Sequence, residues 1–182
     1  MCSPTLPVRL TLSPRMQYRA TEGTRMLVIG AGINPVVGAV NQDLHPGPGI
    51  GATWTLTERW PVDDGIFDKV VGLQVLEHIP VESSLFVCQE AHRVLVPGGA
   101  LILEVPDFPK CCARFLGEDE AGMLRAIYST DRHVGDAHRW GWDARQLGLL
   151  VTLAGFHCFH TEPGTDYHSV QIPTVRIEAA RI

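Results

Sequence analysis

Two glycines and an aspartate near the start of the chain have the spacing of a nucleoside-binding site. Gly30 and Gly32 directly follow the apolar run 26–29, which is typical of a strand buried on both faces. Glycines at such a strand end let a ligand approach the backbone closely. Asp43 closes a second predicted strand, where its carboxylate can accept hydrogen bonds from both ribose hydroxyls. Two glycines could form a plain tight turn and Asp43 could belong to a surface loop, but together they favour a nucleoside site.

Three histidines are the candidate catalytic residues, because imidazole titrates near neutral pH. They are His78, His133 and His138. Each could equally be a surface or structural histidine, and His138 could be fixed by its neighbours Arg139 and Trp140. The sequence therefore assigns no general base.

The cysteines predict neither a disulfide framework nor a metal site. There are five, an odd number, at spacings that do not suit a secreted disulfide scaffold. Two mixed sets were weighed as metal ligands: Cys111 and Cys112 with His133 and His138, and His157, Cys158 and His160. Neither has the paired C-x-x-C spacing of a structural zinc site, so we predict no bound metal.

Length and charge limit the class of protein. A chain of 182 residues suits a single domain, here taken as 1–182. The net charge of −5 gives no strong nucleic-acid signal. No apolar run reaches the length of a membrane span, and the N-terminus does not resemble a signal peptide. We expect a cytoplasmic protein without a membrane partner.

Strands and helices alternate along most of the chain. Residues 1–24 are predicted as an N-terminal arm, and 108–141 as a less regular stretch with one helix at 118–128. The predicted strands are 26–29, 36–43, 67–73, 100–105, 156–161 and 174–180, and the other predicted helices are 81–95 and 143–154. This order predicts an α/β fold: a doubly wound, mostly parallel Rossmann-like sheet with an antiparallel C-terminal strand pair.

A longer run of motifs resembles a known family. The segment 67–79, FDKVVGLQVLEHI, is similar to the "FD-x-V … VLEHI" run of class I S-adenosylmethionine (SAM)-dependent methyltransferases. The segment 90–102, EAHRVLVPGGALI, resembles that group's "E-x-x-RVL-x-PGG-x-L". Residues 27–44 resemble the compact "IGxG … N-x-D-L" variant, and 138–156 the later "HR … L … L … AGF" run. The resemblance covers roughly residues 25–160 and implies SAM as cofactor.

The resemblance also implies roles for individual residues. Gly30, Ala31 and Gly32 would pass under the methionine part of SAM, Asp43 would hold the ribose, and Leu44 would lie against the adenine. Leu73 and Gln74 would face the sulfonium and amino-acid portion, with Glu77 and His78 at the mouth of the site. The stretch 108–141 would form a substrate cap.

Two departures from the family pattern are visible. Only residues 33–35 separate the glycines from the next apolar run, and Pro35 opposes a helix, so the first helix cannot form there. The ligand then lacks a helix N-terminus beside its carboxylate. Where relatives carry an acidic partner for adenine, this chain offers Thr55, which can hydrogen-bond but carries no charge.

These observations predict an enzyme, a SAM-dependent methyltransferase acting on a small-molecule, glycan or nucleotide-type acceptor. The alternative is a non-catalytic binding or scaffold protein of the same fold, which a collapsed pocket near Gly30 and Asp43 would favour. A nicotinamide-dependent oxidoreductase fits less well, because the third spaced glycine of that fingerprint is absent.

Overall fold

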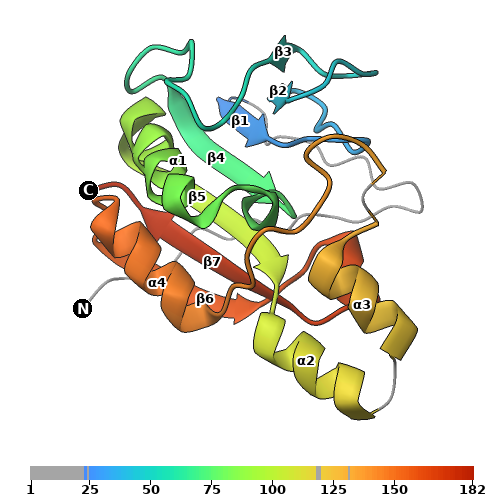
Figure 1. The fold of residues 1–182 in the computed structure, drawn as a ribbon. Coiled ribbons are helices and arrows are strands. Elements are labelled where there is room, and N and C mark those ends of the chain that lie inside the picture. Colours follow the sequence, from blue (N-terminus) through green and yellow to red (C-terminus); the bar gives the residue numbers. More distant parts are fainter. Residues whose placement is uncertain (1–22, 24, 118–119, 131) are drawn as a thin grey trace.

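A seven-stranded sheet in the order β3-β2-β1-β4-β5-β7-β6 forms the centre of the computed structural model (Figure 1). The structure describes residue 23 and residues 25–117, 120–130 and 132–182, so the predicted arm lies outside the described residues apart from Gly23. The strands are β1 (Met26–Ile29), β2 (Val40–Asp43), β3 (Ala52–Thr53), β4 (Phe67–Leu73), β5 (Leu95–Pro106), β6 (Cys158–Pro163) and β7 (Thr174–Ala180). The first five are parallel, and β7 runs antiparallel between β5 and β6. The predicted fold class is confirmed.

Two helices cover one face of the sheet. They are α1 (Val81–Val94) and α4 (Ala144–Leu153), and their apolar stripes bury the inward side chains of β1, β4, β5 and β7 (Figure 1). Helix α4 begins as its sequence predicts. Asp143 Oδ1 accepts the Gln146 N–H at 2.7 Å, and Gln146 Oε1 accepts the Asp143 N–H at 3.1 Å, which forms a complete capping box.

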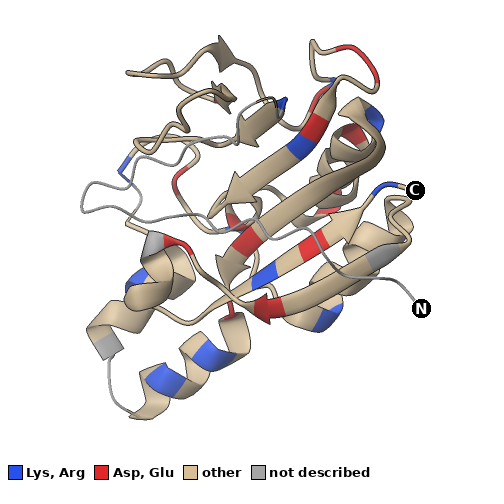
Figure 2. Cartoon of the chain, turned by 180° about the vertical axis from the view of Figure 1, so that it is seen from behind, with Lys and Arg blue, Asp and Glu red and all other residues tan. Residues whose placement is uncertain are grey.

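The opposite face of the sheet carries no helix among the residues that the structure describes. Figure 2 shows it from behind, with charged positions on the neighbouring strands. Its apolar residues belong to a small separate cluster that includes Met26, Val71 and Ile102. As the sequence predicted, residues 30–39 form no helix between β1 and β2.

The remaining helices lie beyond the carboxyl end of β5. Helix α2 (Phe108–Gly117) packs against α3 (Glu120–Tyr128), and Cys111, Met123 and Ala126 form their buried contact. Short 3₁₀ helices follow β4 (η1, Leu76–His78) and precede β7 (η2, Tyr167–Val170). Within the described part of the chain, no helix is long and apolar enough to cross a membrane.

Several predicted boundaries are wrong. Strand β2 begins at Val40 rather than at Val36, because the Asn41 side chain bonds both the N–H and the carbonyl of Val36, which curls 36–40 into a turn. Strand β5 begins at Leu95 and continues through Gly98 and Gly99, which were predicted to precede it. Helix α2 was not predicted, and β6 starts two residues later than expected.

Candidate active site

The loop after β1 can be built only from glycine at its first position. Gly30 has a left-handed backbone (φ +61°), and an added β-carbon would overlap the side chain of Val75. The Gly30 N–H donates to Oε1 of Gln42 at 3.1 Å, and the Ala31 N–H donates to the Gln42 carbonyl at 2.9 Å. Gln42 is 1% exposed and donates to the Trp54 carbonyl at 2.6 Å. This one buried amide therefore fixes the glycine loop to β2 and to the segment after β3.

Asp43 lies at the carboxyl end of β2, directly beside the glycine loop. Its Oδ2 accepts the Gly32 N–H at 2.8 Å, and its Oδ1 accepts the His45 N–H at 3.0 Å. A carboxylate has about four lone-pair positions, so each oxygen can accept a further hydrogen bond. The carboxylate is thus held in place with acceptor capacity to spare for a ligand.

The carboxyl end of β4 carries a strained turn. Gln74 follows Leu73 with φ +54°, a left-handed conformation that is costly for a residue with a β-carbon. Its N–H donates to the Glu104 carbonyl at 2.7 Å, and its side-chain Nε2 is buried without a hydrogen-bond partner in the described structure. Strain of this kind is characteristic of functional sites, and here it directs the chain into η1.

Thr55 follows β3 rather than lying within it. Its hydroxyl is 2.9 Å from that of Thr57, and it also accepts the Thr57 N–H at 3.3 Å. The family resemblance placed Thr55 where relatives carry an acidic partner for adenine, and in the structure it lies beyond β3, which ends at Thr53. Thr55 still reaches the wall of the cavity described next.

A cavity of about 970 Å³ opens at the carboxyl ends of β1, β2 and β4. This is the position at which open α/β sheets bind ligands, and the volume is at the upper end of the usual range for ligand sites. Every predicted site residue lines it: Gly30, Ala31, Gly32, Asp43, Leu44, Thr55, Leu73, Gln74, His78, His133 and His138. The structure therefore brings together residues that are separated by more than a hundred positions in the sequence.

The loop 132–136 closes one side of this cavity. Its centre is Asp136, which is 5% exposed and accepts hydrogen bonds from the backbone and the guanidinium of Arg132. Hydrogen bonds from Arg132 hold the pKa of Asp136 well below its usual range. The loop touches the opposite rim, where His45 Nε2 lies 3.0 Å from the Val134 carbonyl and the His45 ring packs edge-on against His133. The rim is thus closed by a contact between two loops.

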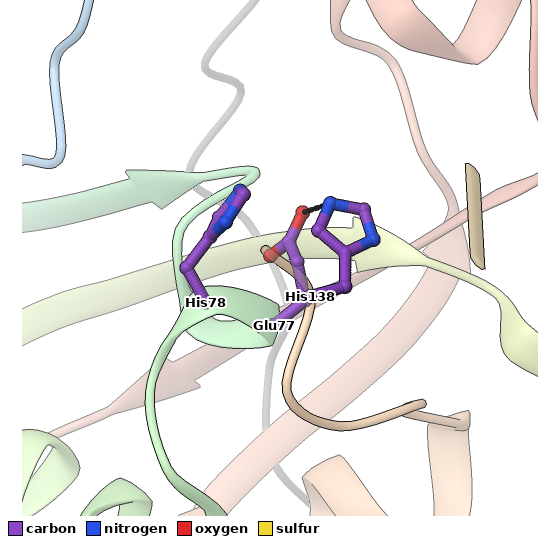
Figure 3. Close-up of side chains that lie close together, drawn as sticks. All are labelled: Glu77, His78 and His138. Atoms are coloured by element: carbon purple, nitrogen blue, oxygen red, sulfur yellow. Dashed lines mark ion pairs between the residues drawn. The ribbon is translucent and has the colours of Figure 1, made fainter. Parts of the chain in front are cut away.

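A second polar group lies deeper in the cavity, where Glu77, His78 and His138 converge (Figure 3). The ring centroids of His78 and His138 are 4.6 Å apart, and His138 Nε2 is 4.0 Å from Glu77 Oε1. Burial raises the pKa of Glu77 to about 8. Burial and the neighbouring His78 lower the pKa of His138 to about 4, and burial also lowers the pKa of His78.

The backbone explains why these side chains meet. The Glu77 carbonyl accepts the N–H groups of Arg139 at 2.7 Å and Trp140 at 3.3 Å, which joins η1 to the segment that follows the loop. His138 is fixed from α3, because its Nδ1 lies 2.9 Å from the Ala126 carbonyl. His133 does not join the group, since its side chain is 56% exposed at the rim.

A buried glutamine and three arginines of the site were not predicted from the sequence. Gln42 gave no signal beyond its place next to Asp43, although a polar residue inside a buried strand is itself unusual. Arg125, Arg132 and Arg176 also line the cavity and were not singled out. Arg176 is 4% exposed on β7, which only the sheet order could bring to this edge.

Comparison with known proteins bears on the family. Residues 15–103 match the model of a methyltransferase domain family. A search of curated proteins found no match.

Solved structures share the fold at low sequence identity. A SAM-dependent methyltransferase from Thermotoga maritima superposes with a TM-score of 0.61 at 17% identity, covering 89% of this chain and 84% of that one. One from Methanosarcina mazei gives 0.60 at 19% identity, with coverages of 90% and 94%. The methyltransferase CalH, solved with S-adenosylhomocysteine (SAH), gives 0.58 at 18% identity and is covered to 52% of its length, against 88% of this chain. Over residues 15–103 the chain is thus similar to a methyltransferase domain family, and it shares the fold of solved SAM-dependent methyltransferases.

Proposed function

We propose that the cavity binds SAM along the glycine loop and Asp43 and that a small molecule with a hydroxyl group accepts the methyl group. The observation that carries the proposal is the common cavity: the residues predicted for the donor and the polar group around Glu77 line one space of about 970 Å³. That volume is large for a single small ligand, so a donor and a compact acceptor fit side by side.

The donor side follows the strand ends. Gly30 and Gly32 leave the loop backbone accessible, and Asp43 has free acceptor positions for the two ribose hydroxyls. Leu44 is 49% exposed at the rim and offers an apolar surface for the adenine. Leu73 and Gln74 then face the reacting end of the donor.

The acceptor side is polar and partly enclosed. Glu77, His78 and His138 form its floor, while the stretch 108–141 supplies the loop at its rim. The contact between His45 and Val134 narrows the opening, which favours a small molecule over a polymer. The net charge of −5 also disfavours a nucleic-acid substrate.

Methyl transfer depends more on the orientation of the two reactants than on acid–base catalysis, because a sulfonium methyl group is already activated. The acceptor oxygen attacks the methyl carbon, the carbon–sulfur bond breaks with its electron pair on sulfur, and the hydroxyl proton leaves to a base. The cavity aligns the two reactants and excludes water. His78, His133 and His138 all line the cavity and are the candidates for that base.

The scaffold alternative predicted a cavity collapsed by side chains near Gly30 and Asp43. The cavity is open there, which favours the enzyme. Calorimetric titration with SAM and SAH tests the proposal: we expect one binding site for each. Absence of binding at millimolar ligand would overturn it. Methyl transfer from labelled SAM to a panel of small hydroxylated compounds would then identify the acceptor, and transfer only to a polymer would refute the assigned substrate class.

A further inference from the structure

Glu77, His78 and His138 form a cluster of three different ligand-bearing side chains inside the cavity. One ligand atom from each lies within 4.8 Å of the others. Figure 3 shows the side chains converging from η1 and from the segment after the loop 132–136. The cluster is thus assembled from two chain segments, and the backbone bonds of the Glu77 carbonyl hold those segments together.

The carboxyl group of Glu77 is buried, and among the described residues no hydrogen bond or opposite charge replaces its hydration. The residue is 1% exposed, and neither carboxylate oxygen has a hydrogen-bond partner in the described structure. No lysine or arginine of the described residues forms an ion pair with it, and the charged groups that act on it, Asp166 and Glu104, carry the same sign. A buried carboxyl group without hydrogen-bond partners is unusual in a native fold, and it calls for a bound ion, a water or a proton.

The histidines present the lone pairs that a cation would need. His138 Nδ1 lies at hydrogen-bonding distance from the Ala126 carbonyl, which places the ring proton on Nδ1 and leaves the lone pair of Nε2 facing Glu77. A histidine that binds a metal through one ring nitrogen usually donates its other ring N–H to a backbone carbonyl or a carboxylate. His78 adds a buried Nδ1 that has no hydrogen-bond partner among the described residues.

We propose that Glu77, His78 and His138 bind a first-row divalent transition cation in the floor of the cavity. Two imidazoles and one carboxylate form the facial ligand set that leaves positions open for exogenous ligands, and the open side here faces the cavity. Ligand atoms about 2.1 Å from a cation lie about 3 Å from one another, so the 4.0 Å separation of Glu77 and His138 must close by about 1 Å. We expect rotation of the Glu77 side chain to supply that movement, because the Ala126 carbonyl holds the His138 ring.

The sequence predicted no metal because only cysteine-containing sets were weighed there. This set contains no cysteine, and its third member lies 60 positions beyond the adjacent Glu77 and His78. If the proposed function holds, the cation takes the acceptor's hydroxyl oxygen as a further ligand. That coordination would lower the pKa of the hydroxyl and help its proton leave before the oxygen attacks the methyl carbon.

Titration of the metal-free full chain with ZnCl₂ and with MnCl₂, in the absence of SAM and acceptor, tests the site. We expect one cation per chain, with affinity reduced at least about 100-fold in Glu77→Gln. The matched control Glu82→Gln, an exposed residue on α1, should bind like the unsubstituted chain. Equal binding by Glu77→Gln and Glu82→Gln, or no binding by the unsubstituted chain, would overturn the proposal.

Two further measurements keep the test decisive. Circular dichroism and SAM titration of Glu77→Gln verify that the variant is folded. If the variant is not folded, the visible spectrum of the unsubstituted chain loaded with Co²⁺ tests the site instead. Absorption bands of low-symmetry Co²⁺ with nitrogen ligands support the site, and the spectrum of hydrated Co²⁺ refutes it. Cation binding without SAM binding would refute only the proposed function, and SAM binding without cation binding would refute only the metal site.

Discussion

Replacement of Asp43 by asparagine tests the centre of the proposed donor site. The carboxylate accepts the N–H groups of Gly32 and His45 and has a lone-pair position on each oxygen for the ribose. Asparagine keeps one acceptor oxygen and turns an N–H₂ donor toward either a backbone N–H or the ribose. Hydrogen bonds to a charged group are worth about 1.5–3 kcal/mol, so we expect SAM and SAH to bind about 10- to 150-fold more weakly.

Isothermal titration of both ligands measures this loss directly. Asp63→Asn is the matched control, because it removes the same charge from an exposed position that does not line the cavity. Thermal unfolding without ligand gives the cost to the loop itself, and the shift in midpoint on adding SAH gives a second measure of affinity. If Asp43→Asn binds SAH within twofold of the unsubstituted chain, Asp43 does not hold the ribose and the proposed donor orientation is wrong.

Three further predictions concern stability. Gly30→Ala should lower the free energy of unfolding by about 2 kcal/mol or more, because it adds overlap with Val75 to the cost of a left-handed backbone. Urea unfolding of Gly30→Ala and of Gly32→Ala separates the two costs, because the added β-carbon of Gly32→Ala would meet no atom within 4 Å. Asp143→Ala should lose about 1 kcal/mol with the capping box of α4, and an unchanged unfolding midpoint would contradict this. Hydrogen bonds from Arg93 lower the pKa of Glu90 below its ordinary 4.5. The stabilisation from this pair is therefore complete above pH 4.5 and is lost as the pH falls through the lowered pKa. The free energy of unfolding of Glu90→Gln should change less over that acid range.

The elements that the sequence predicted well are those with strong local patterns. Helix α1 and strand β4 have nearly their predicted bounds, because a long amphipathic stripe and a continuous apolar run each specify one structure. Helix α4 was predicted at both ends, since Asp143 and Gln146 form its capping box and Gly155 follows it with φ +100°. In these segments local preference and tertiary packing agree.

The segments that were predicted wrongly depend on contacts that the sequence does not show. The apolar run 36–39 has the composition of a strand, but the Asn41 side chain satisfies Val36 and forces a turn. Helix α2 follows Asp107, whose Oδ1 accepts the Lys110 N–H at 3.3 Å, but its apolar contact, the burial of Cys111 against α3, depends on the fold. A side-chain amide and a helix-to-helix contact both override local preference here.

In the candidate site too, some features follow from the sequence and others only from the fold. Gly30 and Asp43 were found because strand ends recur at a fixed edge of a parallel sheet, whatever connects them. The pairing of Glu77 with His138 could not be found, since it depends on the bonds from Arg139 and Trp140 to one carbonyl. Both histidines were candidates because imidazole titrates near neutral pH, but only the fold shows that they lie beside the carboxyl group of Glu77.

The missing first helix does not remove the donor site, because strand register rather than the helix positions its residues. Leu27 pairs with Val40 and Ile29 with Gly72, so the ends of β1, β2 and β4 meet at one level of the sheet. A helix at this point would normally fix the glycine loop from outside. Here the buried Gln42 fixes it from within the sheet, through one bond to Gly30 and one toward the segment after β3. The helix's contribution to binding the donor's carboxylate is lost with it, so in the proposed donor site we expect the affinity for SAM to depend strongly on Asp43.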